Sequence, residues 1–202
     1  MKNCSYLALG DSYTIGEQVL LADSFPYQTI QLLRRNNKKF AFNAPEIIAK
    51  TGWTTDELSA AIEQTSFLPK YEFVSLLIGV NNQYRGRPVE NYKEEYEVLL
   101  QKAIQFAGNN NKRVFVLSIP DWGITPFAAQ RDINSIASEI DAYNSACKLI
   151  TENFHCHYID ITASLRADGK QTDFIASDGL HPSGKEYAKW ATKLSEAVSL
   201  NL

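Results

Sequence analysis

The feature that most constrains the fold of this chain is a regular alternation of short apolar segments with longer amphipathic ones. The short segments predict β-strands at Tyr6–Leu9, Glu46–Ala49, Phe73–Ile78, Arg113–Ile119 and Cys156–Ile161. The longer segments predict helices at Ser24–Arg35, Thr54–Thr65, Val89–Phe106, Asp132–Asn153 and Ser183–Val198. Strands that alternate with helices form a parallel sheet covered on both faces. We therefore expect a single domain over residues 1–202 with a flavodoxin-like three-layer α/β/α fold and a central five-stranded parallel sheet.

Local sequence features support the predicted elements. FVSLLI at Phe73–Ile78 is almost continuously apolar, which is typical of a strand buried on both faces. Thr54 and Glu57 have the spacing of a capping box. Ser24 and Ser183 are expected helix N-caps.

Composition bounds the possible functions. The chain has 202 residues, 45% of them hydrophobic, and a net charge of -3, which is ordinary for one globular domain and gives no basic surface for nucleic acid. No apolar run is long enough for an integral membrane segment, and the N-terminus lacks the pattern of a signal peptide. Three widely spaced cysteines fit a reducing compartment. These features predict a cytoplasmic protein and leave its oligomeric state open.

Polar residues with complementary chemistry follow the predicted strands. Ser12 comes directly after the first strand, and Asp178 and His181 lie in a loop after the last one. Ligands of such folds bind at the carboxyl ends of the strands. A serine hydroxyl needs a base to act as a nucleophile, and a histidine base needs a carboxylate to fix its tautomer. We therefore expect Ser12 as nucleophile, His181 as base and Asp178 as its orienting partner.

The tetrahedral intermediate of acyl transfer also needs hydrogen-bond donors for its oxyanion. The backbone N–H groups of Ser12 and Gly52 and the side-chain amide of Asn81 are the candidates. Gly52 suits this role because the absence of a side chain lets a substrate approach the backbone. Asn82 is the alternative to Asn81 as the residue that faces the site.

Four sequence blocks carry a family resemblance. ALGDSYTIG, AKTGWTTDEL, LLIGVNNQYRG and SDGLHPSGKEY occur in this order between residues 8 and 187. Together they resemble the SGNH, or GDSL-type, hydrolases. The resemblance implies ester hydrolysis without metal or organic cofactor, with the same five site residues in the same roles. Many members have Asp where this chain has Asn82, which changes a supporting residue rather than the proposed donor.

The sequence determines the substrate less closely than the reaction. Aromatic residues that follow the motif positions or the fourth strand are expected to line the site: Tyr13, Trp53, Tyr84, Trp122 and Phe127. Such a pocket suits a small-molecule ester with an acyl chain, an aryl group or a sugar. We expect a serine ester hydrolase similar to GDSL-type esterases and lysophospholipases, acting through an acyl-enzyme on a carboxylic ester. A carbohydrate O-acetylesterase with the same triad is the alternative, and the resemblance does not separate either from a thioesterase.

Alternatives from other classes fit less well. A non-catalytic binding domain of the same fold has no need of a paired base and orienter. GLHPSGKE at residues 179–186 approaches a phosphate-binding loop, but Glu186 stands where Ser or Thr is required. His155 and His157 could both contact a metal, but no further Cys or His cluster completes a ligand shell.

Overall fold

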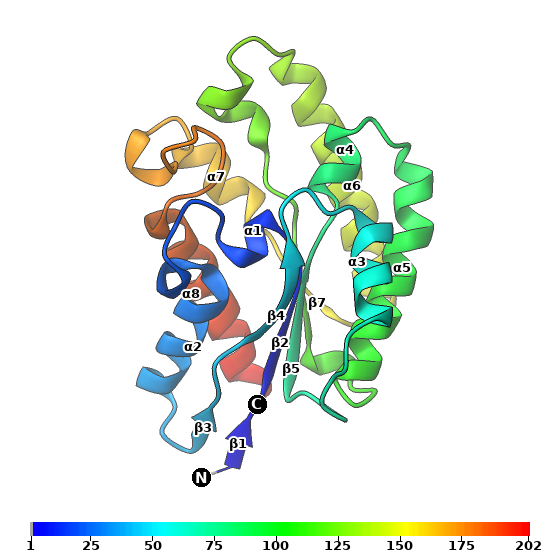
Figure 1. Ribbon diagram of the computed structural model, residues 1–202, viewed down its shortest axis with the longest axis vertical. Coiled ribbons are helices and arrows are strands. Elements are labelled where there is room, and N and C mark those ends of the chain that lie inside the picture. The colour runs from blue at the N-terminus through cyan, green and yellow to red at the C-terminus, as the bar shows by residue number, and fades with distance from the viewer. Residues whose placement is uncertain (1) are drawn as a thin grey trace.

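The computed structural model describes residues 2–202 and has three layers, with a parallel sheet between two layers of helices (Figure 1). The strands are β1 (Lys2–Cys4), β2 (Tyr6–Asp11), β3 (Phe40–Phe42), β4 (Glu46–Lys50), β5 (Phe73–Leu77), β6 (Val114–Leu117) and β7 (His157–Ile159). The α-helices are α1 (Ser12–Ile15), α2 (Phe25–Asn36), α3 (Thr55–Glu63), α4 (Val80–Tyr84), α5 (Val89–Phe106), α6 (Ile133–Asn153), α7 (Thr162–Asp168) and α8 (Gly184–Asn201). Short 3-10 helices lie at Leu21–Asp23, Asn111–Arg113, Trp122–Ile124, Pro126–Ala128 and Thr172–Phe174.

The main sheet has the strand order β4-β2-β5-β6-β7, and all of its neighbouring strands are parallel. Counted along the chain, this is the flavodoxin-like order 2-1-3-4-5. The predicted fold class is therefore confirmed. The order reverses at β2, between β4 and β5, and ligands of this fold bind at such a reversal point.

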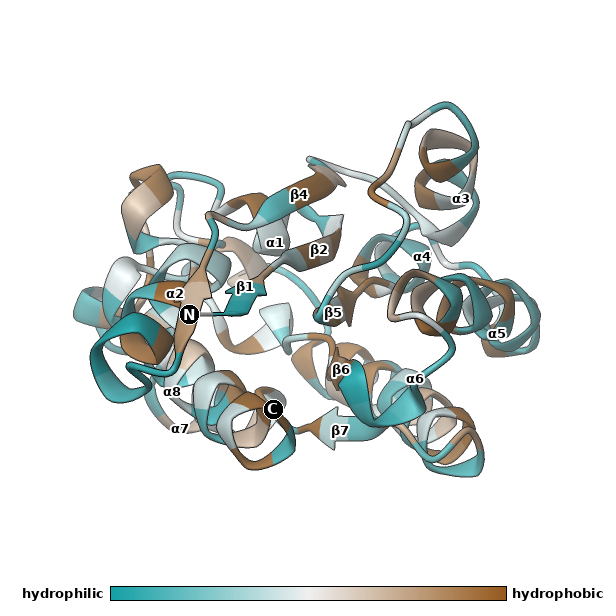
Figure 2. Ribbon diagram, turned by 90° about the horizontal axis from the view of Figure 1, so that it is seen from below, coloured by the Kyte–Doolittle hydropathy of each residue, from teal (hydrophilic) through white to brown (hydrophobic). Residues whose placement is uncertain are grey.

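The helices are divided between the two faces of the sheet. Helices α2 and α8 lie against each other on one face, and α3, α5 and α6 cover the other (Figure 1). Seen from below, hydrophobic residues are concentrated on the strands and on the helix surfaces that face them (Figure 2). The central strands β2, β5 and β6 are therefore shielded from water on both faces, whereas the edge strands β4 and β7 are partly exposed.

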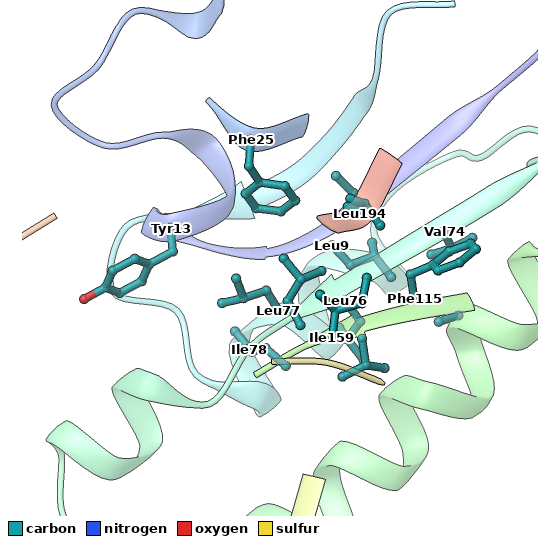
Figure 3. Close-up of a cluster of buried hydrophobic side chains, with 14 of the residues drawn as sticks. Leu9, Tyr13, Phe25, Val74, Leu76, Leu77, Ile78, Phe115, Ile159 and Leu194 are labelled. Atoms are coloured by element: carbon teal, nitrogen blue, oxygen red, sulfur yellow. The ribbon is translucent and has the colours of Figure 1, made fainter. Parts of the chain in front are cut away.

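The core is built around β2 and β5, whose residues are all buried. Leu9, Leu76 and Leu77 lie close together in this cluster, with Leu194 of α8 nearby (Figure 3). Burial of each such side chain stabilises the fold by about 1.5–3 kcal/mol relative to exposure. The central strands are therefore a rigid base for the residues at their carboxyl ends.

Most of the predicted elements are present, with end points that differ by a few residues. The helix at Val89–Phe106 has the predicted bounds. The region 40–50, predicted to hold one strand, forms two, and β3 pairs with β1 in a separate small sheet. Pro45, which lies between them, has no backbone N–H and cannot donate to a ladder, so pairing stops and restarts there.

Two of the three predicted helix starts form as expected. The Thr54 N–H donates to Glu57 (2.9 Å), and Ser183 Oγ accepts from the Lys185 N–H (3.2 Å). Ser24 occupies the N-cap position of α2, but its hydroxyl donates to the Leu21 carbonyl (2.8 Å) instead of accepting from the helix. The preceding 3-10 turn brings this carbonyl within reach and competes for the hydroxyl.

Candidate active site

The strand register brings the first three motif blocks to one edge of the sheet. Asp11, the last residue of β2, is level with Lys50 at the end of β4, and Gly10 is level with Leu77 at the end of β5. Each strand is followed within a few residues by a predicted site residue: Ser12, Gly52 and Asn81. This edge is the upper end of the sheet in Figure 1, next to α1.

Ser12 is the first residue of the short helix α1 rather than part of an irregular turn. Asp11 caps this helix, and its Oδ1 accepts the Tyr13 N–H (3.0 Å). A Cβ on Gly10 would lie only 2.1 Å from Thr14 Oγ1 and 2.4 Å from the Leu77 carbonyl oxygen. Only glycine therefore lets α1 fold back closely enough to fix Ser12 at the end of β2.

Ser12, His181 and Asp178 form a continuous hydrogen-bonded chain. His181 Nε2 lies 2.9 Å from Ser12 Oγ, and His181 Nδ1 lies 2.5 Å from Asp178 Oδ2. An ionised carboxylate can only accept hydrogen bonds, so the hydrogen of the neutral ring is on Nδ1. Nε2 then carries a lone pair directed at the Ser12 hydroxyl. This is the arrangement in which imidazole can accept the serine proton.

The loop geometry holds Asp178 as an ionised orienting group. Its Oδ1 accepts the N–H groups of Leu180 (2.9 Å) and His181 (3.0 Å). Partial burial opposes ionisation, but the bond to the His181 ring and these two N–H groups outweigh it and lower the pKa of Asp178. On the other side of the histidine, the Tyr13 ring packs with its centroid 5.1 Å from that of the imidazole.

Gly52 follows β4, and Asn81 lies in α4 after β5. Gly52 has φ of +84°, a conformation that L side chains rarely adopt, and Arg85 Nη2 donates to its carbonyl (2.6 Å). Asn81 Nδ2 donates to the Trp53 carbonyl (3.0 Å). A side-chain amide has two N–H donors, so this bond positions Asn81 and leaves a second donor available.

Asn82, the alternative to Asn81, has a different environment. It is fully buried, and it bonds Thr55 twice: its Oδ1 accepts the Thr55 N–H (3.1 Å) and its Nδ2 donates to Thr55 Oγ1 (2.6 Å). It therefore satisfies the first turn of α3 and ties that helix to α4. Of the two asparagines, Asn81 is the one that lines the cavity.

A cavity of about 190 Å³ opens beside Ser12 and His181. Its walls include Tyr13, Tyr84 and Trp122 of the residues expected there, together with Gly52 and Asn81. Phe127, also expected there, is a lining residue, and the complete set adds three residues that the sequence analysis did not assign to the site: Thr51, Val80 and Leu180. Leu180 could have been found from its place between Asp178 and His181, whereas Val80 has no distinctive sequence pattern.

Trp53, expected at this cavity, is not one of its lining residues. The left-handed turn at Gly52 redirects the chain, and the Trp53 side chain packs against the edge of the hydrophobic core. Its contribution to the site is its backbone carbonyl, which accepts from Asn81. The structure therefore places the Trp53 ring against the core rather than in the wall of this cavity.

Asp11 places a second carboxyl group behind Ser12. Its side chain is fully buried, and Oδ2 has no hydrogen-bond partner within residues 2–202. Burial disfavours the charged form and raises the pKa of Asp11 to about 7. Asp11 therefore keeps its proton over much of the pH range in which the Asp178 carboxyl is ionised.

A second groove lies away from Ser12 and His181. This larger groove of about 710 Å³ runs along α6, β7 and α7, and it contains the ion pairs Arg166–Asp141 (2.8 Å) and Lys148–Glu152 (3.9 Å). His157 stacks on Phe115 in that region. Over residues 2–202 there is no cluster of three or more potential metal ligands, and no helix of that part is long and apolar enough to cross a membrane.

Comparison with known proteins gives a family match. Residues 8–189 match the model of the GDSL-like lipase/acylhydrolase family. This range includes Ser12, Gly52, Asn81, Asp178 and His181. A search of curated proteins found no match.

Solved structures of similar fold include several esterases. An acetylxylan esterase from Geobacillus stearothermophilus has 18% identity and a TM-score of 0.76, covering 98% of this chain and 96% of its own. A lipase/acylhydrolase from Enterococcus faecalis has 16% identity and a TM-score of 0.74, with 98% and 95% covered. An esterase from Pseudoalteromonas sp. has 17% identity and a TM-score of 0.69, with 97% of each chain covered. At these identities the likeness establishes the fold.

Proposed function

Because this chain belongs to the GDSL-like lipase/acylhydrolase family, whose activity is generally ester hydrolysis, we propose that it is a serine hydrolase of carboxylic esters that forms an acyl-enzyme. The observation that carries the proposal is the hydrogen-bonded chain from Ser12 through His181 to Asp178. Nucleophilic catalysis by serine needs a base within hydrogen-bond distance of the hydroxyl and a third group that orients the base, and these two hydrogen bonds provide both.

In the proposed mechanism, Ser12 Oγ attacks the ester carbonyl carbon while His181 Nε2 takes its proton. Asp178 holds Nδ1–H and stabilises the imidazolium that forms. The imidazolium then gives the proton to the leaving alcohol, which leaves Ser12 acylated. In the second half of the reaction His181 takes a proton from water, whose oxygen attacks the acyl carbonyl carbon. The bond to Ser12 Oγ then breaks, the imidazolium returns the proton to Oγ, and the acid leaves.

The proposed oxyanion donors are the N–H groups of Ser12 and Gly52 and the second amide N–H of Asn81. Each well-placed donor can lower the barrier by about 3–4 kcal/mol. All three residues line the same cavity. The bonds from Arg85 to the Gly52 carbonyl and from Asn81 to the Trp53 carbonyl hold this wall in place before substrate binds.

Hydrolysis of p-nitrophenyl acetate, butyrate and octanoate by the wild type and by Ser12→Ala tests the proposal. We expect wild-type turnover and a loss on the order of 10⁴-fold or more in the variant, because members of such a triad act as a unit. The control is Ser177→Ala, which removes an exposed serine from the loop that carries Asp178 and His181. Equal activity of Ser12→Ala and wild type would exclude Ser12 as the nucleophile.

Carbohydrate O-acetyl esters are the second candidate substrate, and the small volume of the cavity favours them. Ser12, His181 and Asp178 would act as described above, and the acid released would be acetate. One protein of similar fold is an acetylxylan esterase. Acetate release from acetylated xylan by wild type, absent in Ser12→Ala, tests this candidate.

A further inference from the structure

A buried amide that takes no part in the proposed chemistry lies behind the cavity wall. Gln83 of α4 is 5% exposed. Its Oε1 accepts the Trp122 indole N–H (2.7 Å), and its Nε2 donates to Glu139 of α6 (2.7 Å). The indole can only donate and the carboxylate can only accept, so these two partners fix the orientation of the amide.

The backbone of Trp122 is held as firmly as its ring. Asp121 Oδ1 accepts the Gly123 N–H (2.9 Å), and Thr125 Oγ1 donates to the Trp122 carbonyl (2.7 Å). Arg166 Nε in turn donates to Asp121 Oδ2 (2.8 Å). These contacts fix the main chain after β6, and the bond to Gln83 then determines how the indole is turned about its side-chain torsions.

Trp122 forms an aromatic wall with two neighbours. Its ring centroid lies 5.2 Å from that of Tyr84 and 6.0 Å from that of Phe127, both in edge-to-face arrangements. Tyr84 and Phe127 are about half exposed, whereas Trp122 is buried. Trp122 is therefore the inner part of this wall, and Gln83 is the group that holds it from behind.

The volume of the cavity sets a size for its occupant. The cavity has a volume of about 190 Å³, and the buried Trp122 ring forms part of its wall. We expect a short acyl group such as butyryl to fit beside this ring and a longer chain such as octanoyl to meet it.

We propose that Gln83 is a positioning residue that sets the acyl-length limit of the site by holding the Trp122 indole in the cavity wall. This inference rests on the proposed esterase function and assigns the cavity to the acyl part of the substrate. Without the Gln83 acceptor, the buried indole N–H would have no partner, and the ring would turn to find one. The displaced ring would then leave room for longer acyl chains.

The test compares wild type, Gln83→Met, Trp122→Phe and the double variant. kcat and KM are measured on p-nitrophenyl acetate, butyrate and octanoate, so the leaving group stays constant. Methionine keeps much of the length of glutamine and removes its hydrogen bonds. The matched control is Gln28→Met, which removes another bridging amide, bonded to the carbonyls of Asp23 (2.6 Å) and Gly184 (2.9 Å).

We expect wild-type kcat/KM to fall sharply from butyrate to octanoate. In Gln83→Met the octanoate-to-butyrate ratio of kcat/KM should rise about tenfold, the effect of a small change in a hydrophobic pocket. kcat on acetate should stay within about threefold of wild type, because the reacting groups are untouched. Gln28→Met should keep the wild-type ratio.

Trp122→Phe should raise the same ratio, and adding Gln83→Met to it should have no further effect, because Gln83 acts through the indole. Phenylalanine has no indole N–H, so the Trp122→Phe background shows whether Gln83 acts only through its bond to Trp122. Thermal unfolding identifies any variant that fails to fold; if Gln83→Met does so, Gln83→Leu replaces it in the cycle.

The outcomes separate the inference from the function on which it rests. If the wild type hydrolyses all three esters without a length limit, or if Gln83→Met slows all three in equal proportion, the inference is overturned and the esterase function stands. An independent effect of Gln83→Met in the Trp122→Phe background also overturns the inference. A wild type that hydrolyses none of the three esters overturns the inference. Release of acetate from acetylated xylan by the wild type then decides whether the esterase function stands.

Discussion

Replacement of Asp11 by Asn tests whether burial raises the pKa of the carboxyl group next to Ser12 and so makes stability depend on pH. In the folded protein the pKa of Asp11 is about 7, against 3.8 for an ordinary aspartate, because its carboxyl is removed from water. A raised pKa means that the native state binds the proton more tightly than the unfolded chain. Its contribution to stability is fully present below pH 3.8 and is lost as the pH rises through about 7.

The expected magnitude follows from the pH interval. Between pH 5 and pH 7 the native carboxyl keeps a proton that the unfolded chain has lost. Two pH units at about 1.36 kcal/mol each give a loss of about 2–3 kcal/mol. Asparagine stays neutral and keeps an oxygen that can accept the Tyr13 N–H. The free energy of unfolding of Asp11→Asn, relative to wild type, should therefore increase by about 2–3 kcal/mol from pH 5 to pH 8.

Urea unfolding at the two pH values measures this difference, because contributions of other ionisable groups cancel between wild type and variant. The control is Asp132→Asn, which changes the N-cap carboxylate of α6, bonded to the N–H groups of Asn134 and Ser135 (both 3.1 Å). That side chain is exposed, so the burial argument does not apply to it. A stability difference between Asp11→Asn and wild type that is equal at pH 5 and pH 8 would refute the reasoning.

Three further predictions concern residues at and next to the site. Asp178→Asn should lower kcat/KM by about 10²- to 10⁴-fold on p-nitrophenyl acetate while leaving measurable activity, because the amide cannot stabilise the imidazolium as a carboxylate does; wild-type rates would contradict the assignment of Asp178. Asn82→Ala should lower the free energy of unfolding by about 1–3 kcal/mol, because it leaves the buried Thr55 N–H without a partner. Asn81→Ala should instead lower kcat by about 10²- to 10³-fold with a smaller change in stability, as for an oxyanion donor; paired rate and urea measurements would show whether the two roles are reversed.

Much of the architecture follows from local features of the sequence. The helix at Val89–Phe106 could be predicted to the residue because its apolar positions recur with helical spacing. The five strands of the main sheet could be recognised from their apolar character, although β7 is shorter than predicted. Once the strands are parallel and their carboxyl ends share one edge, residues that directly follow them are brought together. That is why the sequence pointed to Ser12, Gly52 and Asn81 as neighbours. His181, which follows α7 and a 3-10 helix, was predicted from its chemistry and its motif instead.

Other features depend on where each side chain points, which local sequence does not encode. Trp53 follows a motif glycine, as the other expected lining residues follow their motif positions, yet the turn at Gly52 directs its ring to the core edge. The division between Asn81 and Asn82 results from helix α4, which is too short for a periodic pattern and places neighbouring residues on different sides.

The sequence by itself therefore determined the layers of the fold, the edge of the sheet that carries the site, and the residue types gathered there, because periodicity and chain order are enough for these. Only the tertiary structure decided the buried state of Asp11, the size of the cavity and the link from Gln83 to Trp122. These depend on contacts between segments far apart in the chain, where the packing of several elements fixes distances and excludes water.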